Sequence, residues 1–170
     1  GVALVNKEND SYFSTFLGDY YLQQGDVEKA KSYYQKAREL DFQNYLALQR
    51  IKMMDNNQTE IFKDKILPDS YKDYKIYNDK ILSVHKKINS IVMRSLFQEL
   101  AEGYPDGIIL TQGYEEVVGE IEEQKVFAQK HNLTVYDWQE DEEFKSLSQK
   151  VSSLNSSVKR TSLIRGGYVK

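Results

Sequence analysis

Apolar side chains recur at steps of three and four residues through residues 11–44, which is the spacing of one face of an α-helix. The pattern is interrupted once, at Gln24-Gly25-Asp26. Gly25 supplies the left-handed backbone that ends a helix, and Asp26 is a favourable N-cap for the next helix. We therefore predict two amphipathic helices packed antiparallel as a hairpin, the first beginning near Asn9-Asp10. Its recurring apolar positions are Leu17, Tyr20, Tyr21, Ala30, Tyr33, Tyr34, Ala37 and Leu40.

This predicted hairpin resembles one tetratricopeptide repeat (TPR), a helix–turn–helix motif of about 34 residues. Two positions depart from the family pattern: Ser14 stands where a large aromatic residue is usual, and Phe42 stands where proline is usual. The resemblance implies a surface that holds other proteins, and it implies no chemistry. The matching signature positions are Leu17, Gly18, Tyr21, Gly25, Ala30, Tyr34, Ala37 and Leu40.

The resemblance also implies a concave groove lined by the first helix of each hairpin. In one well-known version of the groove, lysine and asparagine bind a C-terminal carboxylate. Here the corresponding positions hold Thr15 and Asp19. We therefore expect an extended protein or peptide segment held by aromatic and amide contacts. The alternative is that the hairpin only packs on the rest of the chain as a structural lid. The expected groove residues are Tyr12, Thr15, Asp19, Leu22, Gln23, Gln49 and Met53.

Further helices are predicted after the hairpin. One covers Tyr45 to about Met54, and a short one covers residues 59–67 and stops at Pro68. A long helix follows from about Tyr71 to Glu102 and ends at Gly103-Tyr104-Pro105. Its apolar positions can pack along the chain's own domain or form a coiled coil with a partner, and extra apolar residues beside them favour the first interpretation. Those positions are Tyr74, Tyr77, Ile81, Val84, Ile88, Ile91, Leu96 and Leu100.

The C-terminal third has a different pattern. Residues 107–111, Gly-Ile-Ile-Leu-Thr, form a short apolar run typical of a buried parallel strand, and residues 133–138 indicate a second strand. A helix from about Glu115 to Lys130 lies between them. The predicted fold class is therefore mainly α: TPR-like hairpin, long connecting helix, and small C-terminal α/β unit of βαβ type.

Residues 104–170 also resemble the C-terminal half of SGNH (GDSL-type) esterases, in the order of helix, apolar run, helix, Leu-Thr-Val-Tyr-Asp and a final Gly166-Gly-Tyr-Val. The family places an Asp and a His, three residues apart, just before this Gly-Tyr pair. Here the two positions hold Lys159 and Ser162, and the sequence contains no Gly-Asp-Ser block. A serine esterase needs a base and oxyanion donors, so no catalytic residues are assigned.

Composition narrows the function classes. Of the 170 residues, 29% are charged and 40% are hydrophobic, which is typical of a globular chain, and the net charge of -3 provides no general attraction for nucleic acid. The sequence has no cysteine and no apolar run long enough to span a membrane, so we predict a soluble protein. Because the chain begins with Gly1, both a cytoplasmic location and an extracytoplasmic one after leader removal stay open.

Metal and cofactor sites are not predicted. His85 is expected on the polar flank of the long helix and His131 at a helix end, where a cation suits the helix dipole. Two separate histidines do not make a zinc site. The acidic run 140–143 with Asp137 lacks the alternating ligands of an EF-hand, and Gln112-Gly113-Tyr114 has too few glycines for a phosphate loop.

Together these patterns predict three parts: a TPR-like region over 1–57, a connecting helix over 58–104, and a small α/β unit with a basic, Ser-rich tail over 105–170. The predicted function is a non-catalytic protein-interaction or scaffold module that uses the TPR-like groove. A fragment or degenerate relative of an SGNH-type esterase is the alternative. We expect a protein or peptide partner, no nucleic acid and no cofactor, and the oligomeric state stays open.

Overall fold

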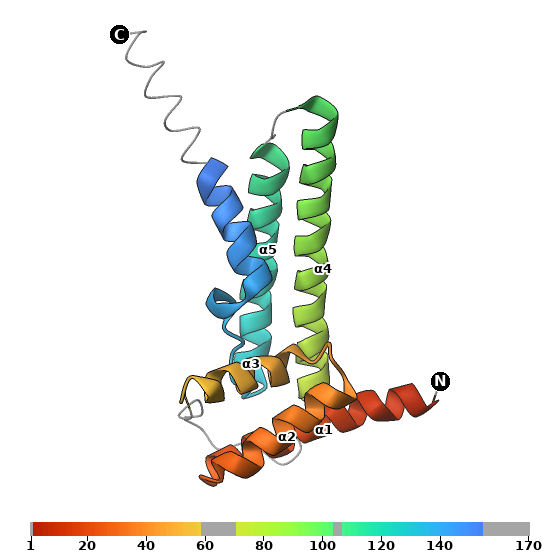
Figure 1. Ribbon diagram of the computed structural model, residues 1–170, viewed down its shortest axis with the longest axis vertical. Helices are drawn as coiled ribbons and strands as arrows, with labels where there is room; N and C mark the ends of the chain where they lie inside the picture. The colour runs from red at the N-terminus through yellow and green to blue at the C-terminus, as the bar shows by residue number, and fades with distance from the viewer. Residues whose placement is uncertain (1, 59–70, 104–106, 155–170) are drawn as a thin grey trace. The chain divides into compact units, whose positions relative to one another are not determined.

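The structure, a computed structural model, describes residues 2–58, 71–103 and 107–154, and every regular element among them is helical (Figure 1). The elements are α1 (Val2–Gln23), α2 (Val27–Leu40), α3 (Tyr45–Asp55), α4 (Tyr71–Glu102), α5 (Gly107–Lys130) and the short 3₁₀ helix η2 (Trp138–Glu140). A further helix covers residues 142–154. The short helix predicted over residues 59–67 lies outside the described residues.

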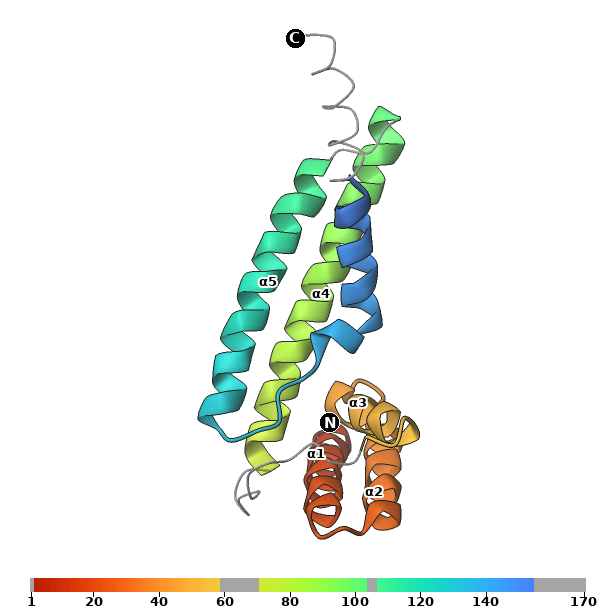
Figure 2. The same cartoon turned by 90° about the vertical axis from the view of Figure 1, so that its left-hand side faces the viewer.

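The predicted hairpin is present as α1 and α2, which lie side by side in both views (Figures 1 and 2). Gly25 adopts a φ of +84° in the turn, and the Asp26 side chain accepts a hydrogen bond from the Lys29 amide as the N-cap of α2. Helix α1 begins at Val2 rather than near Asn9-Asp10, so the sequence misplaced its start. At the helix crossing, Gly18 lies directly against the Tyr34 ring.

The predicted α/β unit is wrong, because the described residues contain no strand. Residues 107–111 are instead the first turns of α5. A short apolar run does not distinguish a buried strand from a buried helix. The spacing of buried residues along the whole segment does, and here it is helical. The buried positions of α5 recur at helical steps: Leu110, Gly113, Val117, Ile121, Gln124 and Ala128.

The second predicted strand is an extended segment without a partner strand. Leu133, Tyr136 and Trp138 are buried, as the apolar pattern indicates, but Trp138 already begins η2. The Tyr136 amide donates to the Tyr77 hydroxyl at 2.6 Å, so a side chain satisfies the backbone here in place of a sheet. The strand order behind the esterase resemblance is therefore absent from the described residues. Lys159 and Ser162 lie outside them.

The chain forms two compact units. The first combines Gly1–Ser83 with Glu122–Tyr136, and the second combines Val84–Ile121 with Asp137–Lys170. Each unit therefore takes one part of α4 and one part of α5. The three-part division by chain position stays a prediction.

The second unit is built on the antiparallel pairing of α4 with α5, and helix 142–154 runs alongside them (Figure 1). Gly113 of α5 lies against Ile91 of α4, a close approach that a side chain on Gly113 would obstruct. Lys87 pairs with both Glu116 and Glu120 across the same two helices, at 3.2 and 3.1 Å.

Candidate interaction surface

The predicted groove residues are mostly buried in the first unit. Tyr12, Thr15, Asp19, Leu22 and Gln49 all have exposed fractions of 6% or less. Gln23 and Met53 are half-buried. The expectation that the first five face an open groove is therefore wrong. Their role in partner binding stays a prediction.

Asp19 is the centre of a buried polar network that joins four helices of this unit. Its carboxylate accepts hydrogen bonds from Arg50 Nε at 3.1 Å, from Tyr74 Oη at 2.6 Å and from Tyr34 Oη. Burial, together with the Asp19 charge, raises the pKa of Tyr34 and Tyr74 well above the usual range, so both hydroxyls stay protonated and donate. The network fixes α1 to α2, α3 and the first turns of α4.

Asn78 of α4 makes a second set of contacts beside this network. Its Oδ1 accepts from the Tyr45 amide at 2.9 Å, and so helps to cap α3, while its Nδ2 donates to Tyr12 Oη at 2.7 Å. Asn44, the N-cap of α3, donates to Thr15 Oγ1 at 2.9 Å. The chain's own residues therefore occupy the polar groups that the TPR resemblance assigned to a partner.

The contacts of Tyr74 and Asn78 with the predicted groove residues could not be predicted from the sequence. The periodicity of α4 showed that this helix buries a face, but it could not show which surface would cover that face. The available signal was a polar Asn78 one turn from Tyr74, next to the apolar positions Tyr77 and Ile81 on the same side of the helix.

Of the two histidines, His85 lies in different surroundings from those predicted, whereas His131 lies at a helix end as predicted. His85 is buried in the second unit, not on a polar flank, and its Nε2 lies 2.6 Å from Asp141 Oδ2 and 4.0 Å from Glu143 Oε2. Asp141 also accepts from the Phe144 amide at 2.9 Å, at the start of helix 142–154. In the first unit, His131 lies next to the end of α5, where its Nδ1 is 3.3 Å from Asp73.

These contacts tie helices together rather than forming a metal centre. Within residues 2–58, 71–103 and 107–154, no group of three or more His, Cys, Asp or Glu side chains is arranged to hold a metal ion.

The second unit carries a different feature, four exposed apolar side chains on one face of α4. Met93, Leu96, Phe97 and Leu100 follow the spacing i, i+3, i+4 and i+7, and their exposed fractions run from 46% to 72%. We call these four residues the α4 apolar face. The sequence placed Leu96 and Leu100 on the buried face, but burial ends at Ile91 and Ser95. The sequence indicates this change of face, because the apolar positions advance by five residues from Ile91 to Leu96 instead of by three or four.

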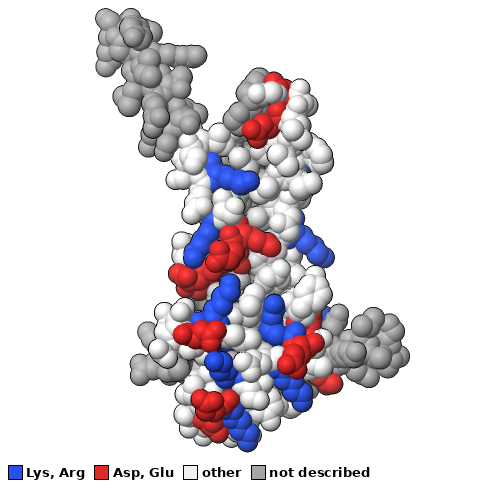
Figure 3. Space-filling model, in the orientation of Figure 1, with Lys and Arg blue, Asp and Glu red and all other residues white. Residues whose placement is uncertain are grey.

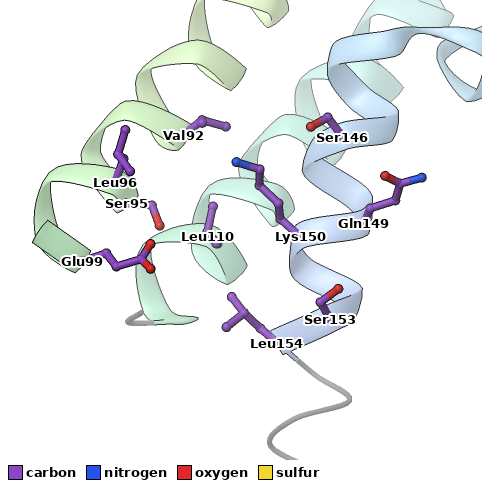
Figure 4. A pocket seen from close by; sticks show the side chains of 10 residues that line it. All are labelled: Val92, Ser95, Leu96, Glu99, Leu110, Ser146, Gln149, Lys150, Ser153 and Leu154. Atoms are coloured by element: carbon purple, nitrogen blue, oxygen red, sulfur yellow. The ribbon is translucent and has the colours of Figure 1, made fainter. Parts of the chain in front are cut away.

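A groove of about 400 Å³ begins beside this face, because Leu96 belongs to both (Figure 4). Helix α4, the first turn of α5 and helix 142–154 form its walls. Apolar side chains alternate with polar ones around it, and Glu99 and Lys150 stand on different helices. The lining residues are Val92, Ser95, Leu96, Glu99, Leu110, Ser146, Gln149, Lys150, Ser153 and Leu154.

Charge is mixed on the one face of the molecule that Figure 3 displays. Figure 3 shows acidic and basic side chains interspersed on the visible face. In the part of the chain that the structure describes, no helix is both long and apolar enough to cross a membrane.

No protein-family model matches this chain, and neither a curated protein nor a solved structure was found to match it. The TPR resemblance therefore rests on the residues of the hairpin alone.

Proposed function

We propose that this chain is a non-catalytic protein-interaction module whose binding surface is the α4 apolar face. The observation that carries the proposal is the exposure of four consecutive face positions, Met93, Leu96, Phe97 and Leu100. Single exposed apolar residues are normal on protein surfaces, whereas contiguous apolar patches mark interaction sites. Burying such a face against another protein removes apolar area from water, which favours association.

The surface differs from the groove that the TPR resemblance suggests. Tyr12, Thr15 and Asp19 already use their polar groups inside the first unit. A partner would have to displace Tyr74 and Asn78 to reach them, and would leave a buried charge without its hydrogen bonds. The α4 apolar face requires no such displacement.

The groove lining supports a binding role over a catalytic one. Ser146 and Lys150 lie one helical turn apart, a spacing that a Ser–Lys hydrolase could use. Such a lysine is activated by burial in an apolar site, but Lys150 is exposed to solvent. An esterase function is not proposed, because the strands that suggested it are absent from the described residues.

The test compares two surface variants of the whole chain. In the first, Phe97→Ser is combined with Leu100→Ser. In the second, Phe42→Ser changes a 75% exposed apolar residue of the first unit. Partners captured by the parent are purified, and their binding to each variant is measured by titration calorimetry. The α4 variant should bind at least about tenfold more weakly, because central apolar anchors commonly contribute 2 kcal/mol or more.

The Phe42 variant should bind as the parent does. Both variants should keep the parent's melting temperature, because the substituted side chains are exposed. If the α4 variant retains every partner at the parent's affinity, the α4 apolar face is not the binding surface.

A further inference from the structure

Two opposite charges stand on different walls of the second-unit groove. Glu99 belongs to α4 and Lys150 to helix 142–154, and both side chains are exposed and point toward the space between these helices (Figure 4). Neither forms an ion pair with another residue of the described chain, whereas Lys87 of the same unit pairs with Glu120. Each rim of the groove therefore offers a charge to a ligand.

Between the rims, part of the groove lining is apolar, and the groove has room for a large side chain. Val92, Leu110 and Leu154 contribute hydrocarbon, and the volume of about 400 Å³ far exceeds the roughly 30 Å³ that one water occupies. A leucine, methionine or phenylalanine side chain of a partner would fit this space.

The occupant must also cover the surface beside the groove. The α4 apolar face continues from Leu96 in both directions, and from Met93 to Leu100 it extends about 10 Å along the helix axis at about 1.5 Å per residue. A small molecule in the groove would leave most of this face in water. An amphipathic helix, with apolar side chains at i, i+3, i+4 and i+7, covers a groove and an adjoining face at once.

We propose that the groove and the α4 apolar face together dock one amphipathic helix of a partner protein, with a large apolar side chain in the groove, an acidic group toward Lys150 and a basic group toward Glu99. This inference rests on the proposed function and adds the chemical class of the partner. The charges on the two flanks of the partner helix would be opposite, since the two rims are opposite.

The probe for this proposal is a synthetic helical peptide of about 18 residues, about five turns. It carries leucine on one face, glutamate along one flank and lysine along the other. Fluorescence anisotropy measures its dissociation constant for the parent chain and for each variant. Ser146→Trp places a bulky ring in the groove, and Ser152→Trp is its control, because Ser152 is exposed on the same helix and does not line the groove.

We expect Ser146→Trp to weaken peptide binding about tenfold or more and Ser152→Trp to leave it unchanged. Lys150→Glu alone should weaken binding about two- to fivefold at low salt, as expected for an exposed ion pair. Lys150→Glu combined with Glu99→Lys should restore it. Exchanging the two rim charges is equivalent to turning the peptide end for end, so the pairs form again.

Three results from the peptide and sedimentation experiments would overturn the inference. The peptide does not bind the parent, or it binds the Ser146→Trp and Ser152→Trp variants equally, or the parent forms a dimer in sedimentation experiments that Ser146→Trp abolishes. The third result would make a second copy of the chain the occupant. A native partner that is lost with Phe97→Ser and Leu100→Ser but kept with Ser146→Trp would refute the groove and leave the proposed function standing. A native partner kept by both variants would refute both.

Discussion

The two units of this chain differ most clearly in one buried polar cluster and one exposed apolar face. In the first unit, Asp19 and Arg50 are fully buried, and the Asp19 carboxylate accepts hydrogen bonds from hydroxyls of two other helices. In the second unit, Phe97 and Leu100 are largely exposed on α4. Polar residues that suggest recognition in the sequence are therefore buried in the fold, and apolar residues that suggest packing are exposed.

A residue's place in a sequence pattern therefore does not determine whether its side chain is exposed. The segment that packs on the motif determines it. In the first unit, the early turns of α4 pack on α1 of the hairpin, with Tyr74 and Asn78 supplying hydrogen bonds to Asp19 and Tyr12. In the second unit, the face of α4 that includes Phe97 is not covered by any described residue. This contrast can be tested at single residues.

The largest effect is expected from Asp19→Ala in the first unit. The substitution leaves the Arg50 guanidinium buried without its carboxylate, and breaking a buried pair in this way costs about 3–5 kcal/mol. Urea denaturation of the whole chain measures the loss. Asp55→Ala is the control, because it removes a solvent-exposed ion pair with Lys31 and should cost about 1 kcal/mol or less. Equal losses for the two variants would show that the Asp19 network does not support the fold.

Four helix boundaries are predicted well from the sequence. Gly25 marks the end of α1, Asp26 the start of α2 and Asn44 the start of α3 through local chemistry, and Gly103, with a φ of +79°, ends α4. These signals act over a few residues and need no knowledge of the tertiary structure.

The start of α5 could not be predicted in the same way. The run Ile108-Ile109-Leu110 has a strand-like composition, and only its continuation through Val117 and Ile121 gives a helical period. A window limited to residues 107–111 therefore favours the wrong element. Local composition was overridden by the packing of α5 along α4.

The candidate sites depend on contacts that are distant in sequence. Tyr74 is 55 residues from Asp19, and Asp141 is 56 residues from His85. No local pattern indicates such pairs. The α4 apolar face was more accessible to prediction, because the five-residue step from Ile91 to Leu96 moves the apolar side chains to another side of the helix.

A smaller effect is expected at the helix crossings, and it should appear in both units. A Cβ atom at Gly18 would lie 2.4 Å from the Tyr34 ring, and one at Gly113 would lie 2.7 Å from the Ile91 side chain. Gly18→Ala and Gly113→Ala should therefore each cost about 1–3 kcal/mol through overpacking. Thermal and urea unfolding measure both.

Gly119→Ala is the matched control for these substitutions. It lies in the same helix as Gly113, and a Cβ atom there meets nothing within 4 Å. The variant should gain about 0.5–1 kcal/mol, since alanine is the better helix former. A gain in stability for Gly113→Ala as well would mean that α4 and α5 do not approach closely at Ile91.

The smallest effect concerns the pH dependence of the second unit. In the first unit, buried Asp19 faces a guanidinium and two hydroxyl donors. In the second unit, Glu143 is partly buried near both His85 and Asp141. Burial raises the pKa of Glu143; the His85 charge opposes this shift and the Asp141 charge adds to it.

A raised pKa means that the folded chain binds this proton more tightly than the unfolded chain does. The resulting stability is complete below the ordinary pKa of a glutamate and is lost as the pH rises through the raised value. Glu143→Gln keeps the side chain neutral throughout. Its melting temperature relative to the parent should therefore increase between about pH 4 and pH 7.

Glu142→Gln makes the same charge change at an exposed neighbouring position and should show a smaller increase. If the melting temperatures of the two variants change with pH in the same way, burial does not raise the pKa of Glu143. The carboxylate of Glu143 would then cost the second unit no stability.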